Sequence, residues 1–457
     1  MAKQAGNRCR GPIGRRDFLR VGALALGGLT LTDVVKARAN SGAERSDTSV
    51  ILLYLSGGPS HLETYDLKPN APIEYRSVFD PIRTNVPGID VCEYLTGHAR
   101  VADKFALIRS VRHTMTSHSD GGIEILTGKT PSRPDPTSTS SSEHPDFGAI
   151  ASWQRGYGSN VMPPYVAVPG RIYMVRPSYL GPQHGPLNAN DPSQPNYRLA
   201  SASLPYGVDS GRLDDRRALR DQFDQLRRDL DASGQMNAGD QFRRTALQML
   251  TSQGVARAFD IQQENASLRD RYGRNPWGQG CLLARRLAEA GTAVTTIVIN
   301  TPFNGEQFTN WDDHIQNAMR PGHFGYYMSV RLPYYDQALS ALIEDIYMRG
   351  LDEKIMVVAM GEFGRTPRLS HNAFGTGRDH WPDAMSVLIS GGGLQMGQVV
   401  GATNARGEYP AQRPLTPKDI LATIYRHLGI DTRHVLIDHT GRPNPILAEG
   451  TPIAELG

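Results

Sequence analysis

Five short segments of the chain bring histidine and carboxylate side chains together at close spacing. They are GGPSHLETYD (57–66), HTMTSHSDGG (113–122), NWDDHIQN (310–317), GEFGRTP (361–367) and GRDHWPD (377–383). Neutral imidazole nitrogens and carboxylate oxygens are the donors that zinc and other divalent cations take from proteins when thiolates are scarce. The sequence therefore predicts a divalent metal ion, zinc or another, with ligands drawn from His61, His118, Asp312, His314, Glu362, Asp379 and His380.

The local sequence supports these candidates unequally. His61 follows Gly-Gly-Pro-Ser, where ligation and a structural turn are both reasonable interpretations, and His314 taken alone fits a surface histidine. The Asp-His-Trp run at 379–381 is stronger, because a carboxylate beside an imidazole is costly to bury without a partner. Glu362 follows an entirely apolar run, which disfavours a solvated position. Arg365 either pairs with Glu362 or clamps an anionic oxygen with its planar guanidinium.

The candidate segments follow apolar runs that resemble buried strands. Continuous apolar runs that end in glycine and polar residues are typical of parallel sheets. They occur at 49–58, 292–300 and 353–364. Because functional residues of such sheets gather in loops beyond the carboxyl ends of the strands, we expect the five segments to meet over one crevice.

Helical patterns alternate with these strands. Apolar residues recur at helical spacing at 276–291, 334–350 and 416–431. The last of these has Thr416 as an N-cap, Pro417 in its first turn and Gly429 as a C-cap. Strands alternating with such helices predict an α/β fold, an α/β/α sandwich with a mostly parallel, doubly wound central sheet.

Composition narrows the class of protein. The chain has 457 residues, 39% hydrophobic and 21% charged, which is ordinary for a globular protein with a sizeable core. Its formal net charge is +3, and Lys and Arg form no stripe interleaved with aromatics, so we expect no nucleic-acid binding. With three cysteines, a Cys-rich zinc site is excluded, and a bridge between Cys92 and Cys281 stays open.

The N-terminal segment has the features of an export signal. GRRDFLRVGALALGGLTL contains Arg15-Arg16 and a short apolar run, and small residues follow at 37–39. This pattern predicts a twin-arginine signal peptide over residues 1–39 and a location in the periplasm or cell envelope. The apolar run is far short of the ~20 residues that span a membrane, so we expect no transmembrane span in the mature chain. Whether the leader is cleaved stays open.

The remainder, 45–457, is expected to form a single domain with two loop insertions. A Pro/Ser/Thr-rich stretch at about 133–146 is either a flexible cover over a site or a solvated insertion. A second irregular stretch at about 170–215 is rich in Pro, Gly, Asn and Tyr. A charged helical segment near 211–270 is expected to pack on one flank of the sheet.

Several segments together carry a family resemblance. They are LYLSGGPSHLETYDLKP, SLRDRYGRNPWGQGCLLARRLAEAG, VVAMGEFGRTP, GRDHWPDAMSVLISGGG, GATNARGEYPAQRPLTPKDILATIYRHLGID and GRPNPILAEGTPIAEL. On these segments the chain is identified as a member of the exported bacterial family called domain of unknown function 1501, from about residue 45 to the C-terminus. That family resembles the alkaline phosphatase and sulfatase superfamily, whose members hold one or two metals at strand ends of an α/β/α sandwich.

Several residues that act as the nucleophile or as metal ligands in the superfamily are replaced in this chain. TSHSDGGIEILTGKTP (116–131) resembles a sulfatase signature, with Leu-Thr-Gly at 126–128 but His118 in the nucleophile slot. The metal-binding Asp that normally ends the first strand is missing, unless His61 or Asp66 replaces it. A later Asp-His-Gly-Glu resembles the Glu-Phe-Gly-Arg at 362–365, and the last ligand histidine is matched by His380. Because covalent catalysis needs an activated hydroxyl or hydrate, the usual covalent route is not expected.

Three interpretations follow. In the first, the histidines and acids hold a metal ion, and a metal-bound water attacks a phosphate or sulfate ester directly, with His118 and Arg365 as catalytic candidates. In the second, a non-catalytic envelope protein uses the crevice to bind an anionic small molecule, an anionic polysaccharide or a protein partner. In the third, the residues form a structural polar network in an inactive relative.

Overall fold

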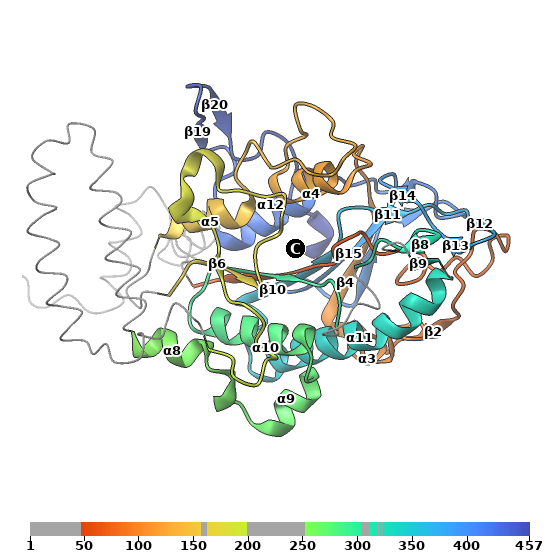
Figure 1. Ribbon diagram of the computed structural model, residues 1–457, viewed down its shortest axis with the longest axis horizontal. Coiled ribbons are helices and arrows are strands. Elements are labelled where there is room, and N and C mark those ends of the chain that lie inside the picture. Colours follow the sequence, from red (N-terminus) through yellow and green to blue (C-terminus); the bar gives the residue numbers. More distant parts are fainter. Residues whose placement is uncertain (1–46, 157–161, 199–251, 303–309, 318–319, 322) are drawn as a thin grey trace, which may run out of the picture. The chain divides into compact units, whose positions relative to one another are not determined.

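The computed structural model describes residues 47–156, 162–198, 252–302, 310–317, 320–321 and 323–457 (Figure 1). The predicted leader, residues 1–39, lies outside this part, as do residues 199–215 of the second insertion and 211–251 of the charged segment. Among the described residues, no helix has the length and apolarity needed to cross a membrane. Cys92 and Cys281 are both buried free thiols, so no bridge joins them.

An eight-stranded sheet organises the described residues. Its order across the sheet is β16 (Gln398–Val400), β4 (Phe105–Val111), β15 (Met385–Gly391), β10 (Ile355–Met360), β1 (Ser49–Tyr54), β7 (Val294–Val298), β5 (Tyr165–Val168) and β6 (Leu187–Asn188). Neighbouring strands pair in parallel except at β15, which runs antiparallel to both β10 and β4.

Helices cover both faces of this sheet (Figure 1). One face carries α10 (Pro276–Glu289) and α11 (Phe324–Met348), and the other carries α4 (His118–Thr127), α5 (Phe147–Arg155) and α12 (Pro417–Leu428). Strand β1 shows why both faces are covered. Its alternate residues Ile51 and Leu53 belong to one core, and Val50 and Leu52 belong to the other. The fold is therefore an α/β/α sandwich with a mostly parallel sheet, as predicted.

The elements predicted from local patterns form close to their expected bounds. The three apolar runs become β1, β7 and β10, and the three helical patterns become α10, the second half of α11, and α12. Helix α12 begins with a capping box between Thr416 and Asp419, has Pro417 in its first turn, and ends at Gly429 with φ 71°. The sequence did not identify β4, β5 or β15.

The reversed direction of β15 places an additional segment at the functional edge. The carboxyl ends of β1, β4, β7 and β10 lie at the same edge because these strands run in one direction. Strand β15 enters the sheet at that edge, since Met385 at its start pairs with Val111 at the end of β4. The residues just before β15, which include Asp379 and His380, therefore lie beside the loops that leave the other strands.

The loop at 133–146 is ordered around a single carboxylate. Asp135 accepts hydrogen bonds from the backbone amides of Thr137, Thr139 and Ser140, at 2.9, 2.9 and 2.7 Å. The amide of Asp135 in turn donates to Asp120 Oδ2 in α4, at 2.7 Å. The loop is thus tied to the helix that carries His118.

Candidate metal centre

Helix α4 places His118 at the carboxyl edge of the sheet. The helix follows β4 and begins at His118, with Ser117 as its N-cap. The amide of His118 donates to Ser138 Oγ of the neighbouring loop, at 3.1 Å. On the opposite side of the ring lies Phe363, whose ring centroid is 5.3 Å from that of His118. Helix and loop together fix the position of the imidazole.

The carboxylate of Asp312, in the loop after β7, is the centre of the site. Three imidazoles direct Nε2 at this group: that of His118 is 3.3 Å from Oδ2, and those of His314 and His380 are 2.9 and 3.1 Å from Oδ1. Among the described residues, ligand atoms of His118, Asp312 and His380 lie within 4.8 Å of one another, as a metal site requires. His314 adjoins this group through Asp312 and His380.

Each of the three rings is held by its other nitrogen. Nδ1 of His118 is 2.7 Å from Glu362 Oε1, Nδ1 of His380 is 2.7 Å from the carbonyl oxygen of Thr116, and Nδ1 of His314 is 2.8 Å from Asp379 Oδ1. Carboxylates at neutral pH and carbonyls only accept hydrogen bonds, so Nδ1 carries the proton in each ring. This pattern of a ligating histidine anchored by a carboxylate or carbonyl is common around protein metal ions.

This arrangement leaves Nε2 of the neutral rings as bare acceptors. Nε2 of His314 and Nε2 of His380 are only 3.0 Å apart, and both face Asp312. Two lone pairs and a carboxylate repel one another unless a proton or a metal cation lies among them. The donor set therefore fits a divalent cation.

In the absence of a metal, protons are expected at this position. Burial by itself lowers the pKa of His118, but hydrogen bonds to Asp312 and Glu362 outweigh burial and raise the pKa to about 9. Burial raises the pKa of Asp312, yet its hydrogen bonds from the three imidazoles and the charge of Arg365 hold that pKa far below its usual range. Asp312 is thus anionic and His118 carries positive charge, whereas burial lowers the pKa of His380.

Glu362 and Arg365 hold members of the cluster in position through hydrogen bonds. Glu362 Oε1 accepts from the amide of Gly57, at 2.7 Å, as well as from His118. Arg365 is fully buried and contacts Asp312 rather than Glu362, with Nη2 2.6 Å from Asp312 Oδ1. Its remaining donors go to the carbonyls of Gly57, Gly58 and Arg378. In this geometry Arg365 positions Asp312 and does not face an open site.

Not every predicted ligand joins the cluster. His61 is buried, and its Nε2 lies 2.8 Å from the carbonyl oxygen of Gly407. The burial of His61 lowers its pKa, so the ring is neutral and serves as a structural hydrogen-bond partner. Asp66, the other substitute for the missing first-strand carboxylate, pairs with Lys68 at 3.0 Å. Asp379 does not join the cluster as a ligand but accepts a hydrogen bond from Nδ1 of His314.

Backbone groups and two further side chains of the candidate segments also contribute to the site. The carbonyl of Thr116 and the amide of Gly57 act through the backbone, so residue type does not reveal them. His113 donates from Nε2 to the backbone oxygen of Glu362, at 2.7 Å, and burial lowers its pKa to about 4, which keeps it neutral. Phe363 packs between rings, 4.4 Å from the centroid of His380.

The close approach at Gly57 yields a testable expectation. Gly57 has φ +109°, and a Cβ there would lie 2.5 Å from the amide nitrogen of Asp312 and 2.8 Å from backbone atoms of Trp311. Gly57→Ala is expected to cost at least about 2 kcal/mol of unfolding free energy, because backbone cannot yield as a side chain can. Gly88→Ala is the control: Gly88 has φ +87° and no neighbour within 4 Å, so only backbone strain is added. Urea denaturation of both variants measures the difference, and equal losses would contradict the described contact.

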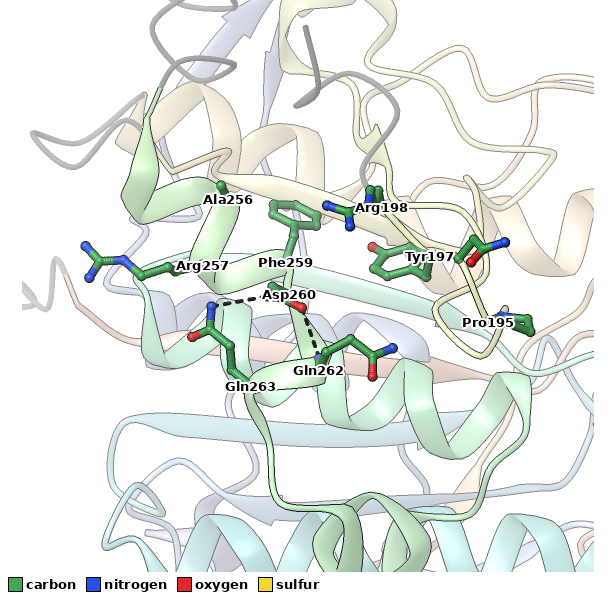
Figure 2. Close-up of a pocket in the computed structure, with 10 residues that line it drawn as sticks. Pro195, Tyr197, Arg198, Ala256, Arg257, Phe259, Asp260, Gln262 and Gln263 are labelled. Atoms are coloured by element: carbon green, nitrogen blue, oxygen red, sulfur yellow. Dashed lines mark hydrogen bonds between the residues drawn. The ribbon is translucent and has the colours of Figure 1, made fainter. Parts of the chain in front are cut away.

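A cavity elsewhere in the molecule does not overlap this cluster. It has a volume of about 470 Å³ and is lined by residues 195–198 and by parts of 256–263 (Figure 2). Figure 2 shows Asp260 hydrogen bonded to the neighbouring Gln262 and Gln263.

Comparison with known proteins places the chain in a family. No curated protein sequence matches it. Its fold aligns with that of a sulfatase, PsFucS1, from Pseudoalteromonas sp., with 11% identity, TM-score 0.37, and coverage of 92% of this chain and 72% of the sulfatase. It also aligns with the lipoteichoic acid synthase LtaP from Listeria monocytogenes, with 10% identity, TM-score 0.36, and coverage of 86% and 74%. A third alignment is with a protein in the alkaline phosphatase superfamily from Vibrio parahaemolyticus, with 9% identity, TM-score 0.38, and coverage of 86% and 68%. The family model described as "Protein of unknown function (DUF1501)" matches residues 47–456, nearly the whole described chain, and the protein therefore belongs to this family.

Proposed function

We propose that the chain is a metal-dependent hydrolase of phosphate or sulfate esters that works without a covalent enzyme intermediate. The observation that carries this proposal is the convergence of three Nδ1-anchored imidazoles on the carboxylate of Asp312. The side chains of His118, Asp312 and His380 remain 19%, 25% and 21% exposed, so a small molecule can reach them.

The ion would be held by His118, Asp312 and His380, with His314 as a further donor. Three imidazoles and one carboxylate form a donor set that suits Zn²⁺ or another borderline divalent ion better than Mg²⁺ or Ca²⁺. Bound there, such an ion supplies Lewis-acid polarisation of an ester oxygen and acidifies a water molecule. Glu362, Thr116 and Asp379 keep the three rings in their ligating orientation.

The residues around the cluster favour an anionic group, and the two serines beside His118 are not free nucleophiles. The N-terminus of α4 directs its positive dipole end toward the edge at which His118 lies, which favours a phosphate or sulfate. The serines that flank His118 are both buried: Ser117 caps the helix, and Ser119 contacts Asp120. Neither hydroxyl is available for attack, which supports direct hydrolysis by water.

Export forms part of this proposal. The Arg15-Arg16 motif and the short apolar run that follows support passage through the twin-arginine pathway. That route carries folded proteins, so a metal would be installed before export, and the enzyme would act in the periplasm or cell envelope.

Turnover measurements test the proposal directly. The full chain is treated with a chelator, reloaded with Zn²⁺ or Mn²⁺, and assayed with 4-nitrophenyl phosphate and 4-nitrophenyl sulfate. We expect hydrolysis of one ester class that disappears with the chelator and returns with the metal. His380→Ala should abolish it, whereas His439→Ala, at an exposed histidine distant in sequence from the cluster, should not. Absence of turnover with every metal, or full activity of His380→Ala, would reject the proposal.

A further inference from the structure

A second groove lies beside a two-stranded ribbon, on the face of the ribbon that points away from the imidazole cluster. Strands β11 (Gly364–Arg365) and β14 (His380–Trp381) form this ribbon, with Arg365 opposite His380 and Gly364 opposite Trp381. Because successive side chains of a strand point to opposite faces, Trp381 faces away from the imidazole cluster. The groove beside it has a volume of about 480 Å³, within the range of small-molecule sites.

The walls of the groove come from three loops that are bonded to one another. The amide of Leu369 donates to the carbonyl of Glu74, at 2.8 Å, and joins the loop after β11 to the loop that contains Tyr75. Trp381 Nε1 donates to the carbonyl of Glu408, at 2.6 Å, and joins the ribbon to the third loop. The guanidinium of Arg406 lies 4.9 Å from the ring centroid of Tyr75 and links the first loop to the third. The groove is therefore preformed.

The groove is lined by an aromatic ring, a guanidinium group without a partner among the described residues, and hydroxyl groups. Arg368 is exposed and makes no hydrogen bond or ion pair with the described residues, although it borders the groove. Trp381 is half-buried, its indole is fixed through Nε1, and no other aromatic ring of the described chain stacks on it. Thr366 and Ser370 add hydroxyl groups. The carboxylate of Glu408 is already engaged by the Asn404 amide, at 2.8 Å.

We propose that this groove binds a sugar ring that carries an anionic substituent. A fixed indole offers the apolar face of a sugar a flat contact surface, and the unpaired guanidinium of Arg368 matches a sulfate, phosphate or carboxylate. The groove adjoins the metal centre at Asp379, whose Oδ2 accepts from Ser370 Oγ at 3.2 Å and whose amide donates to Thr366 Oγ1 at 2.9 Å, whereas Trp381 faces away from the imidazole cluster. Binding here is therefore independent of the metal and of hydrolysis, and goes beyond the proposed function.

Binding of defined sugars to the full chain tests this proposal. Glucose 6-sulfate, glucose 6-phosphate and glucose are titrated by calorimetry, with and without added Zn²⁺. We expect one or both of the anionic sugars to bind at least tenfold more tightly than glucose, whether or not Zn²⁺ is present. Arg368→Gln and Trp381→Leu should each weaken that binding at least tenfold. Arg83→Gln removes an exposed positive charge in β2 (Pro81–Arg83) and should leave affinity within about twofold.

A His380→Ala variant separates the groove from the metal centre. Since Trp381 lies on the other face of the ribbon and Arg368 lines the groove beside it, His380→Ala should bind the anionic sugar as the wild type does, even where it abolishes hydrolysis. The proposal is overturned if neither anionic sugar binds more tightly than glucose, or if Arg368→Gln binds normally. It is also overturned if His380→Ala loses binding while its melting temperature is unchanged, because the sugar would then occupy the imidazole cluster.

Discussion

Asp312→Asn is expected to lower the affinity of the chain for a divalent ion by on the order of 100-fold or more. The substitution keeps the shape of the side chain but removes the negative charge on which three imidazole Nε2 atoms converge. Loss of a residue that only hydrogen bonds to a metal ligand typically costs about 10–100-fold in metal affinity. Asp312 is itself one of the proposed ligands, so we expect a loss at the upper end of this range or beyond it. Equilibrium dialysis followed by metal analysis measures the change. Thermal stabilisation by added Zn²⁺ should disappear in parallel.

The adjacent aspartate provides a matched control. Asp313 is buried and forms an ion pair with the buried Arg331, away from the imidazoles. Asp313→Asn should therefore lower stability, because it weakens a buried ion pair, while the bound metal per chain stays the same. The opposite pattern, with metal lost in Asp313→Asn and kept in Asp312→Asn, would show that the ion is held elsewhere.

Glu63→Gln is expected to destabilise the fold by about 3–5 kcal/mol, the range found when one partner of a buried ion pair is removed. Glu63 and Arg378 are both fully buried and form a bidentate pair, with Nη2 to Oε1 at 2.9 Å and Nε to Oε2 at 3.0 Å. The amide side of Gln cannot accept the second hydrogen bond, so the guanidinium of Arg378 would keep its charge without a full counterion. Urea denaturation monitored by tryptophan fluorescence measures the loss.

An exposed pair of similar geometry serves as the control. Lys418 and Glu449 are 2.7 Å apart, and the Glu449 side chain is 73% exposed. Solvent screens such a pair, so Glu449→Gln should leave the unfolding midpoint nearly unchanged. Equal effects of the two substitutions would mean that the Glu63–Arg378 pair is solvated in solution. Because Arg378 directly precedes Asp379, Glu63→Gln should also loosen the anchor of His314.

Much of the fold follows from local patterns. Strand β1 is buried at every position because both of its faces are covered, and its sequence is mostly apolar, while α12 carries its capping box and closing glycine within its own sequence. The direction of strand β15 could not be predicted in this way. It depends on pairing with β10 and β4 and not on the residues of β15 itself. Yet that direction brings His380 to the edge where His118 lies.

Residue type and position in the chain predicted only some of the residues that form the site. His118, Asp312 and His380 stand in segments that follow or precede core strands, and the structure brings their ligand atoms within 4.8 Å of one another. His61 stands in the same kind of segment, yet its ring bonds to Gly407, which is 346 residues away in sequence. A pattern of a few residues cannot encode a partner at that distance.

The amino-acid sequence by itself determined the α/β class and the set of polar segments that follow the strands, because these depend on periodicity, caps and side-chain identity. Only the tertiary structure decided which loops meet, that Arg365 supports Asp312 from a buried position, and that Trp381 opens onto a different face from His380. Convergence of this kind arises from strand order, strand direction and side-chain alternation across the whole sheet, which no short segment specifies.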